Sequence, residues 1–124
     1  MRTLHTDYIL SPEQPIQCDK TSEGCNGGWT EHAYNYIKNA GGQETESVYP
    51  YTSYSGTTGS CHSNSADYVV KLKSYTTITG SSASQIESNM ASYVQSTGPL
   101  SVCLDASTWS SYTSGIMTSC GNTV

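Results

Sequence analysis

The side chains most informative about possible chemistry are five cysteines and three histidines, which can act as nucleophiles, general bases or metal ligands. The cysteines are Cys18, Cys25, Cys61, Cys103 and Cys120. An odd number at this density indicates an oxidising compartment and disulfides with some partners missing. The alternative is a zinc site, whose ligands would be Cys18, Cys25, Cys61 and His62. Its first two thiols are farther apart than usual and no second close pair follows, so we expect disulfides and no metal or other cofactor.

The strongest local signal is the glycine cluster GCNGGW at residues 24–29. Glycine costs chain entropy on folding, so a cluster usually marks left-handed backbone or the close approach of another group. By itself the cluster indicates only that something contacts this backbone. A tight loop before a helix is the simpler alternative.

Other catalytic motifs are absent from the sequence, which contains no G-x-S-x-G elbow, phosphate-binding P-loop, H-E-x-x-H or dinucleotide fingerprint. His32 follows Glu31 and is best explained as a solvated or structural residue. The net charge is −5 and the cations do not cluster, which argues against nucleic acid as a partner. No apolar run reaches membrane-spanning length, so we expect no membrane partner.

Two helices are predicted around the glycine cluster. Ser11 is a good N-cap, with Gln14 at the reciprocal capping position, and Pro15 should keep the first helix short. An apolar stripe over residues 29–40 predicts the second helix, which the glycines at 41–42 should end.

The rest of the chain is predicted to be a long ordered loop over residues 43–64, strands at 68–75 and 100–104, and one more helix. This third helix has Ser82 and Gln85 as its capping box. Its expected buried face is Ile86, Met90, Tyr93 and Val94. The segment around Trp109 should be a turn or short helix. Helices early and strands late indicate an α+β fold.

Six stretches in this order resemble papain-like cysteine proteases, most closely the cathepsin L-like group. They are LSPEQ…CD at 10–19, GCNGGW at 24–29, AGGQETESVYPYT at 40–52, GSC at 59–61, GPLSVCLDAS at 98–107 and YTSGI…CGN.V at 112–124. The resemblance covers nearly the whole chain from about Leu10. Two departures are Pro15, where the family usually has a helix former, and Gln17, where an acid commonly precedes the cysteine.

The resemblance implies an incomplete papain-like α+β fold. Residues 1–66 would be part of the helical domain with the glycine-rich substrate edge, and residues 67–124 the beginning of the β-barrel-like domain. In the family the nucleophile lies in a Q-G-x-C-G-S-C-W segment upstream of these stretches, and the histidine base follows the last one. The chain is therefore expected to be the middle of a cysteine endopeptidase, with no catalytic residue of its own and no activity alone.

The resemblance also assigns the cysteines. Cys18 and Cys61 match a family disulfide, whereas Cys25 and Cys120 match half-cystines whose partners lie upstream and downstream. Cys103 matches a position on the wall of the pocket for the substrate's second side chain before the cleavage point. It is expected to be a free, buried thiol.

A substrate peptide would contact the remaining predicted site residues. Gly27 and Gly28 match the backbone edge that pairs with the peptide in strand-like fashion. Trp29 and Thr30 match the border of the second-residue pocket and Val124 its base, which favours a medium hydrophobic side chain. Glu23 matches a position near the next pocket.

The expected function is proteolysis by the parent protein, with peptide or protein substrates and with a propeptide or flanking segments as further partners. A lysosomal, vacuolar or secreted location fits the family. One alternative is a non-catalytic peptide-binding or decoy fragment, and another is an active site completed by other chains. Exposed apolar surface and open strand edges should make the chain self-associate.

Overall fold

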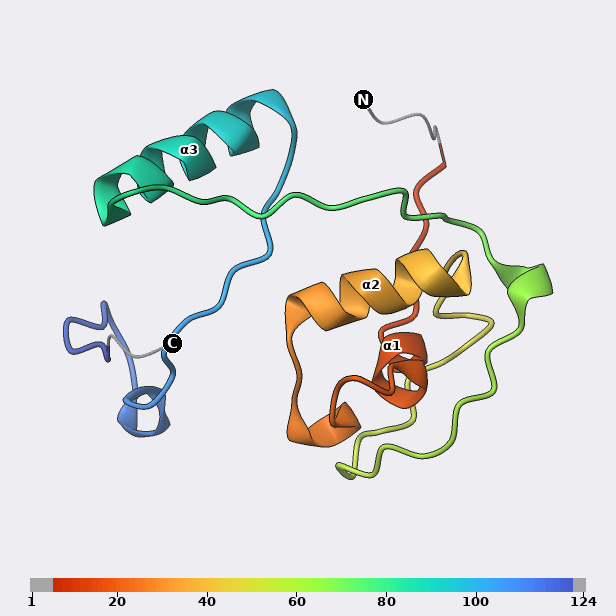
Figure 1. Ribbon diagram of the computed structural model, residues 1–124. Helices are drawn as coiled ribbons and strands as arrows, with labels where there is room; N and C mark the ends of the chain where they lie inside the picture. The colour runs from red at the N-terminus through yellow and green to blue at the C-terminus, as the bar shows by residue number, and fades with distance from the viewer. Residues whose placement is uncertain (1–5, 122–124) are drawn as a thin grey trace. The chain divides into compact units, whose positions relative to one another are not determined.

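The computed structural model describes residues 6–121 of the chain (Figure 1), which divides into two compact units, Met1–Ile78 and Thr79–Val124. Its helices are α1 (Glu13–Cys18), α2 (Thr30–Ala40) and α3 (Ala83–Ser96), with single 3-10 turns at Gly24–Asn26, Ser65–Asp67 and Trp109–Ser111. None of the described helices is long and apolar enough to cross a bilayer. The family domain boundary between residues 66 and 67 stays a prediction, since compact units and enzyme domains need not coincide.

Helix α1 begins at the predicted cap. Ser11 Oγ accepts the N–H of Gln14 at 3.1 Å, and Pro12 already has helical dihedrals. The prediction of a reciprocal bond from the N–H of Ser11 to the side chain of Gln14 is wrong. The N–H of Ser11 donates instead to the carbonyl of Glu44, at 3.0 Å. That bond belongs to an antiparallel bridge between Leu10 and Thr45, so the N–H is not available to Gln14.

Helix α1 is short, as predicted, and Pro15 lies in its first turn. Proline has no N–H, so it cannot make the helical bond to the carbonyl of Ser11. Gln43 Nε2 donates to that carbonyl instead, at 2.7 Å. The helix ends at Cys18 after six residues.

Helix α2 lies against α1 and follows the sequence prediction closely (Figure 1). It starts after Trp29, and Gly41 ends it in the left-handed conformation with φ 91° and ψ 2°. A left-handed C-cap is the conformation that glycine adopts without strain. The apolar stripe and the glycine stop were therefore sufficient to place this helix.

The interior of the first unit is polar. Among the hydrophobic residues described, only Cys18 and Tyr49 are buried. The buried polar residues are Ser11, Glu13, Gln14, Gln17, Asp19, Glu44 and Ser53. Hydrogen bonds between specific side chains, more than apolar contact, therefore determine how this unit packs.

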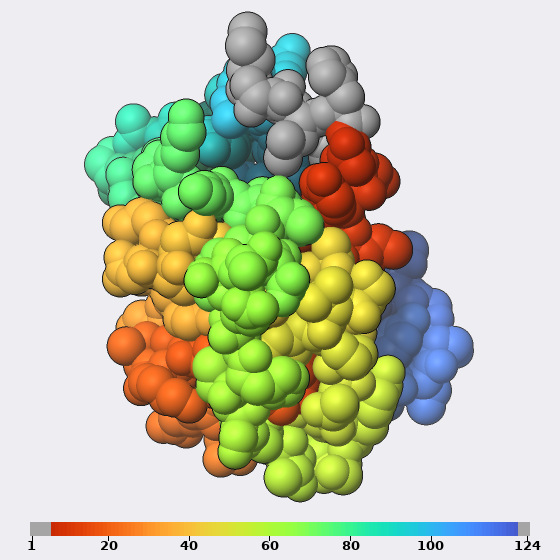
Figure 2. Space-filling model, turned by 90° about the vertical axis from the view of Figure 1, so that its right-hand side faces the viewer, coloured from red at the N-terminus to blue at the C-terminus, as the bar shows by residue number. Residues whose placement is uncertain are grey.

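Residues 43–64 form the predicted ordered loop, and the predicted Cys18–Cys61 disulfide anchors its end to α1. Near its start, Gln43 pairs with Val70 in a second antiparallel bridge. Figure 2 shows the yellow and light-green atoms of this loop on one face of the unit. The loop thus covers the short helix and substitutes for a second layer.

In the second unit, α3 begins where predicted, with Ser82 Oγ accepting the N–H of Gln85 at 3.3 Å. The side chain of Gln85 accepts from the N–H of Ser81 at 2.8 Å, one residue before the expected partner. The prediction that one face of this helix is buried is wrong, because no residue of α3 is buried and Val94 is 51% exposed. Nothing among the described residues of the unit covers that face fully.

Both strand predictions are wrong, because neither segment forms a regular β-strand. Residues 68–75 form only the single bridge at Val70, and residues 100–104 form none, with Leu104 66% exposed. A strand requires a neighbouring strand to satisfy its backbone groups, and the described residues provide no such neighbour. Cys103 lies in this segment and is exposed, not buried as predicted. The short helix Trp109–Ser111 confirms the expectation around Trp109.

The disulfide should contribute much of the stability of the first unit. Cys61→Ser should lower the unfolding free energy by about 2–4 kcal/mol, because the bond closes a long loop in the unfolded chain. Urea unfolding in a Trp109→Phe background measures this unit alone, since Trp29 is then the only tryptophan. Cys103→Ser is the control, and equal unfolding curves for both variants would contradict the prediction.

The second unit should cause concentration-dependent self-association. Val102 is 54% and Leu104 66% exposed on an extended segment, which leaves apolar surface and backbone groups free to contact another chain. Sedimentation velocity should show larger species as concentration rises, and replacing both residues with lysine should reduce them. Ser101→Lys adds charge to the same segment without removing apolar surface. A monomer at all concentrations with cooperative thermal unfolding would refute the expectation.

Candidate functional site

The loop that joins α1 to α2 is built from three backbone hydrogen bonds. The N–H of Asn26 donates to the carbonyl of Glu23 at 3.1 Å, and the N–H of Gly27 to that of Gly24 at 3.1 Å. The N–H of Glu23 donates to the carbonyl of Gly27 at 2.9 Å. The chain therefore turns back on itself, and residue 28 comes to lie beside residue 22.

Each of the three glycines in the loop is required for a different geometric reason. Gly27 has φ 121°, a conformation that residues with a Cβ rarely adopt. A Cβ on Gly28 would lie 2.5 Å from Ser22 Oγ and 2.6 Å from its Cβ. Gly24 combines φ 57° with close packing against Thr58. The local fold alone therefore requires glycine at all three positions.

Gly28 differs from Gly27 in the hydrogen bonding of its backbone N–H and C=O groups. Both polar backbone groups of Gly27 are used within the loop. Over residues 6–121, neither the N–H nor the C=O of Gly28 forms an intramolecular hydrogen bond. Gly28 is exposed, and the neighbouring Trp29 is 60% exposed. An exposed pair of free backbone groups beside an aromatic ring can bind an extended peptide.

A buried carboxylate holds the start of this loop. Asp19 is 5% exposed, and its Oδ1 accepts the N–H of Thr21 at 2.9 Å and its hydroxyl at 2.7 Å. Its Oδ2 accepts the hydroxyl of Ser22 at 2.6 Å. Burial alone would raise the pKa of Asp19, but these bonds, with the nearby charge of His32, outweigh burial and lower it.

The middle of the loop is tied to the segment before the disulfide. The N–H of Cys25 donates to Thr58 Oγ1 at 3.0 Å, and Gly59 lies close to the carboxamide of Gln17. The Cys18–Cys61 bond fixes the same segment to the end of α1. The loop is thus anchored on both sides, which limits the conformations its exposed edge can adopt.

The structure brings only some of the predicted site residues together. Glu23 and Thr30 lie in the first unit with the two glycines and Trp29. Cys103 belongs to the second unit, and Val124 lies outside the described residues. The second-residue pocket that these residues would form therefore stays a prediction.

The described residues contain no thiol–imidazole pair. Cys25, Cys103 and Cys120 are free, but no hydrogen bond within residues 6–121 joins a thiol to His32 or His62. Nor do these residues include a cluster of three potential metal ligands. Because Cys18 and Cys61 are bonded to each other, the zinc alternative is wrong and the disulfide interpretation is confirmed.

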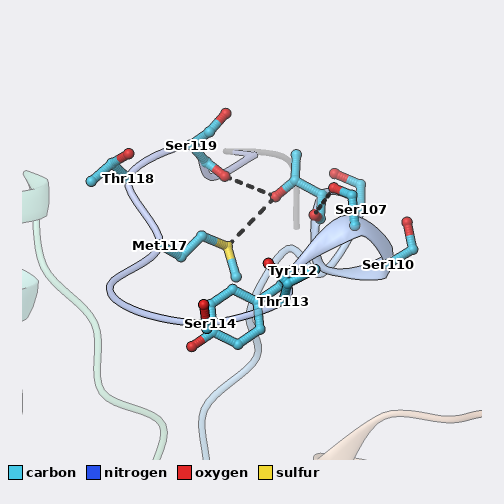
Figure 3. A pocket seen from close by; sticks show the side chains of 10 residues that line it. Ser107, Ser110, Tyr112, Thr113, Ser114, Met117, Thr118 and Ser119 are labelled. Atoms are coloured by element: carbon cyan, nitrogen blue, oxygen red, sulfur yellow. Dashed lines mark hydrogen bonds between the residues drawn. The ribbon is translucent and has the colours of Figure 1, made fainter.

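The second unit has an open hollow lined mainly by hydroxyl groups over residues 107–119 (Figure 3). Thr108 Oγ1 donates to the carbonyl of Ser119 at 3.0 Å across it. Tyr112 is the only titratable residue of its lining, and the hydroxyl of Tyr112 donates to the carbonyl of Gly115 at 2.6 Å. The lining of this hollow contains no thiol, imidazole or carboxylate that could activate one of its hydroxyls.

Comparison with known proteins decides the family. A family model described as papain family cysteine protease matches residues 1–124. The chain belongs to the papain family of cysteine proteases. Cysteine proteinase 1 of Dictyostelium discoideum is 46% identical over 117 residues, which are 86% of this chain and 32% of that protein. Zingipain-1 of Zingiber officinale is 34% identical over 111 residues, 88% of this chain and 47% of that protein.

The structural comparison confirms the papain-like α+β fold. Digestive procathepsin L2 proteinase from the larval midgut of Tenebrio molitor has a TM-score of 0.77 at 30% identity, over 92% of this chain and 34% of that one. The cathepsin L-like resemblance is therefore confirmed, and the family is one of enzymes. The chain spans about a third of the length of this protein and of the Dictyostelium proteinase.

Sequence analysis missed Asp19, Ser22 and Thr58, which fix the glycine loop. Asp19 carried a detectable signal, since aspartate often accepts the backbone N–H two residues later. The sequence carried no signal for the contact between Ser22 and Gly28, because this contact depends on the turn that brings the two residues together. Thr58 lies 33 residues from Cys25 and its contact is purely tertiary.

Glu13 supports the helix from which this loop departs. It is fully buried, and its Oε1 accepts from Gln17 Nε2, Thr52 Oγ1 and Ser53 Oγ, each at 2.7 Å. Burial would raise the pKa of Glu13, but the hydrogen bonds from Ser53 and Thr52 outweigh it and lower the pKa. Gln17, where an acid was expected, therefore pairs with an acid one turn earlier.

Stability should depend on pH through Glu13. Its folded-state pKa lies below the ordinary 4.5, so the ionised form stabilises the fold above that pH and the contribution is lost as the pH falls through the folded-state pKa. Glu13→Gln removes this titration, and its unfolding free energy should fall less steeply below about pH 4.5. Urea unfolding over a pH series measures the slopes. Glu87→Gln on exposed α3 should keep the wild-type slope, and a wild-type slope for Glu13→Gln would contradict the assignment.

Proposed function

We propose that this chain supplies the peptide-binding edge of a papain-family cysteine endopeptidase. The observation that carries the proposal is the free, exposed N–H and C=O of Gly28 in a loop anchored on both sides. A peptide that runs alongside in extended conformation would pair with both groups, as an added strand pairs with a sheet edge. Family membership supports the hydrolytic role of the whole protein.

The proposal assigns the nucleophile and the base to residues other than those described. In a cysteine peptidase, a histidine-activated thiolate attacks the scissile carbonyl to give an acyl-enzyme, and an oxyanion hole stabilises the tetrahedral intermediate. The edge formed by Gly28 would hold the substrate in register with that thiolate. The 124 residues alone would then bind peptides without cleaving them.

The side-chain preference follows from the predicted pocket. Trp29, exposed beside Gly28, would restrict the size of the substrate's second residue, and Cys103 and Val124 would leave the pocket apolar. A medium hydrophobic side chain is therefore the proposed preference, with Glu23 near the next residue of the peptide. A lysosomal, vacuolar or secreted location and control by a propeptide fit the similarity to a procathepsin.

A non-catalytic binder or decoy is the second candidate. The observation in its favour is that no thiol–histidine pair occurs within residues 6–121. Peptide binding by the chain is common to both candidates. Hydrolysis restored on mixing the chain with flanking segments of a papain-family protease would favour the endopeptidase, whereas binding that persists without hydrolysis in the intact natural protein would favour the decoy.

Peptide binding should depend on a single backbone amide of the ligand. A fluorescein-labelled hexapeptide with leucine as its second residue before the cleavage point should bind the chain, as measured by fluorescence anisotropy. N-methylation at the position that faces Gly28 should weaken binding about tenfold, because it removes one hydrogen bond and adds a clash. N-methylation at other positions of the peptide should weaken binding less.

Two results would overturn the proposal. Absence of binding by the wild-type chain would remove its basis, and equal affinity for all methylated peptides would show that the contact is not strand-like. Release of free amine from the same peptide by the chain alone would contradict the claim that it lacks activity.

A further inference from the structure

We propose that Asp19 and Ser22 are positioning residues for the peptide-binding edge, with Ser22 held by Asp19 so that its side chain fixes Gly28. This inference rests on the function proposed above. It assigns a role to two residues that do not themselves pair with the peptide. Their effect on binding would act entirely through the backbone of Gly28.

The carboxylate of Asp19 serves the loop and not the helix. At the end of α1, it is the backbone N–H of Asp19 that caps the helix, by donating to the carbonyl of Pro15 at 3.0 Å. Within residues 6–121, the carboxylate oxygens accept only from Thr21 and Ser22, at 2.6–2.9 Å. Both oxygens are therefore used, and the side chain is fixed at both ends.

The orientation of Ser22 follows from this bond. A hydrogen bond to a buried carboxylate is stronger than one between neutral groups, so the hydroxyl rarely leaves it. The side chain is thereby held against the Cα of Gly28, where a Cβ would come within 2.6 Å of the Cβ of Ser22. Ser22 thus occupies the space that a side chain at residue 28 would need.

A backbone hydrogen bond stabilises the same turn. The N–H of Glu23 donates to the carbonyl of Gly27 at 2.9 Å, and these two residues are the chain neighbours of Ser22 and Gly28 within the turn. Gly28 is therefore fixed by the bonded backbone of Gly27 and by its packing against Ser22. An edge fixed before the ligand arrives loses less conformational entropy on binding, which raises affinity.

A size-swap experiment tests the contact. Gly28→Ala should weaken binding of the labelled hexapeptide about tenfold, because its Cβ displaces Ser22 or the edge. Ser22→Gly opens the space and should weaken binding about threefold through loss of order. The double variant should bind as well as Ser22→Gly, about threefold weaker than the wild type and tighter than Gly28→Ala, a rescue that a purely structural role of Ser22 would not produce.

A second variant tests the carboxylate. Asp19→Asn keeps an oxygen for Thr21 but removes the charge and leaves Ser22 Oγ only an Nδ2 donor in place of its carboxylate acceptor, so binding should weaken about threefold, as for Ser22→Gly. Asp67→Asn is the matched control, since Asp67 is exposed in the same unit and accepts from Asn64 at 2.7 Å. It should leave peptide affinity unchanged.

Measurements without peptide separate this inference from the proposed function. Amide hydrogen exchange at Glu23 and Gly27, whose N–H groups are hydrogen-bonded within the loop, should accelerate in Asp19→Asn and not in Asp67→Asn, and the urea unfolding energies of the size-swap set should be non-additive. If the wild-type chain binds no peptide but these couplings are present, the proposed function fails and the positioning contact stands. Additive unfolding energies, no rescue of binding, or unchanged exchange in Asp19→Asn would each overturn the inference.

Discussion

The carboxamide of Gln14 is the contact on which the first unit depends. Its Nε2 donates to the hydroxyl of Tyr36 on α2 at 3.2 Å and to the carbonyl of Gly42 at 3.3 Å. Its Oε1 accepts the N–H of Glu44 at 2.7 Å. One fully buried side chain therefore joins α1, α2 and the start of the long loop. An apolar residue here would leave two buried backbone groups, the carbonyl of Gly42 and the N–H of Glu44, without this partner, at about 1–3 kcal/mol each.

The polar interior follows from the same constraint. Two helices of 6 and 11 residues bury little apolar surface, so the long loop must pack directly against α1. Its backbone groups need partners, and the side chains of α1 supply them. Tyr49 shows the pattern, since its hydroxyl donates to Gln17 at 2.6 Å and accepts the N–H of His62 at 3.2 Å, while its ring stacks on the imidazole at 4.0 Å. The disulfide at Cys61 keeps this arrangement closed.

Sequence reasoning was reliable where the physics is local. The Ser11 cap and the stop at Gly41 depend on a few adjacent residues, so both could be predicted. The two strands could not, because an alternating apolar pattern shows which face prefers burial and not whether a partner exists. The pairing of Gln14 with Glu44 was equally beyond prediction, since it crosses 30 residues of chain.

The glycine loop shows how a fold requirement and a binding function can share the same residues. Gly27 is needed for its backbone conformation and Gly28 for the space beside Ser22, so both would be glycine in a loop that bound nothing. The binding interpretation therefore depends on a different property, namely which backbone groups the fold leaves unpaired. The turn uses the N–H and C=O of Gly27 and leaves those of Gly28 exposed. A glycine motif locates such an edge, and the hydrogen bonds around it show which residue a peptide can reach.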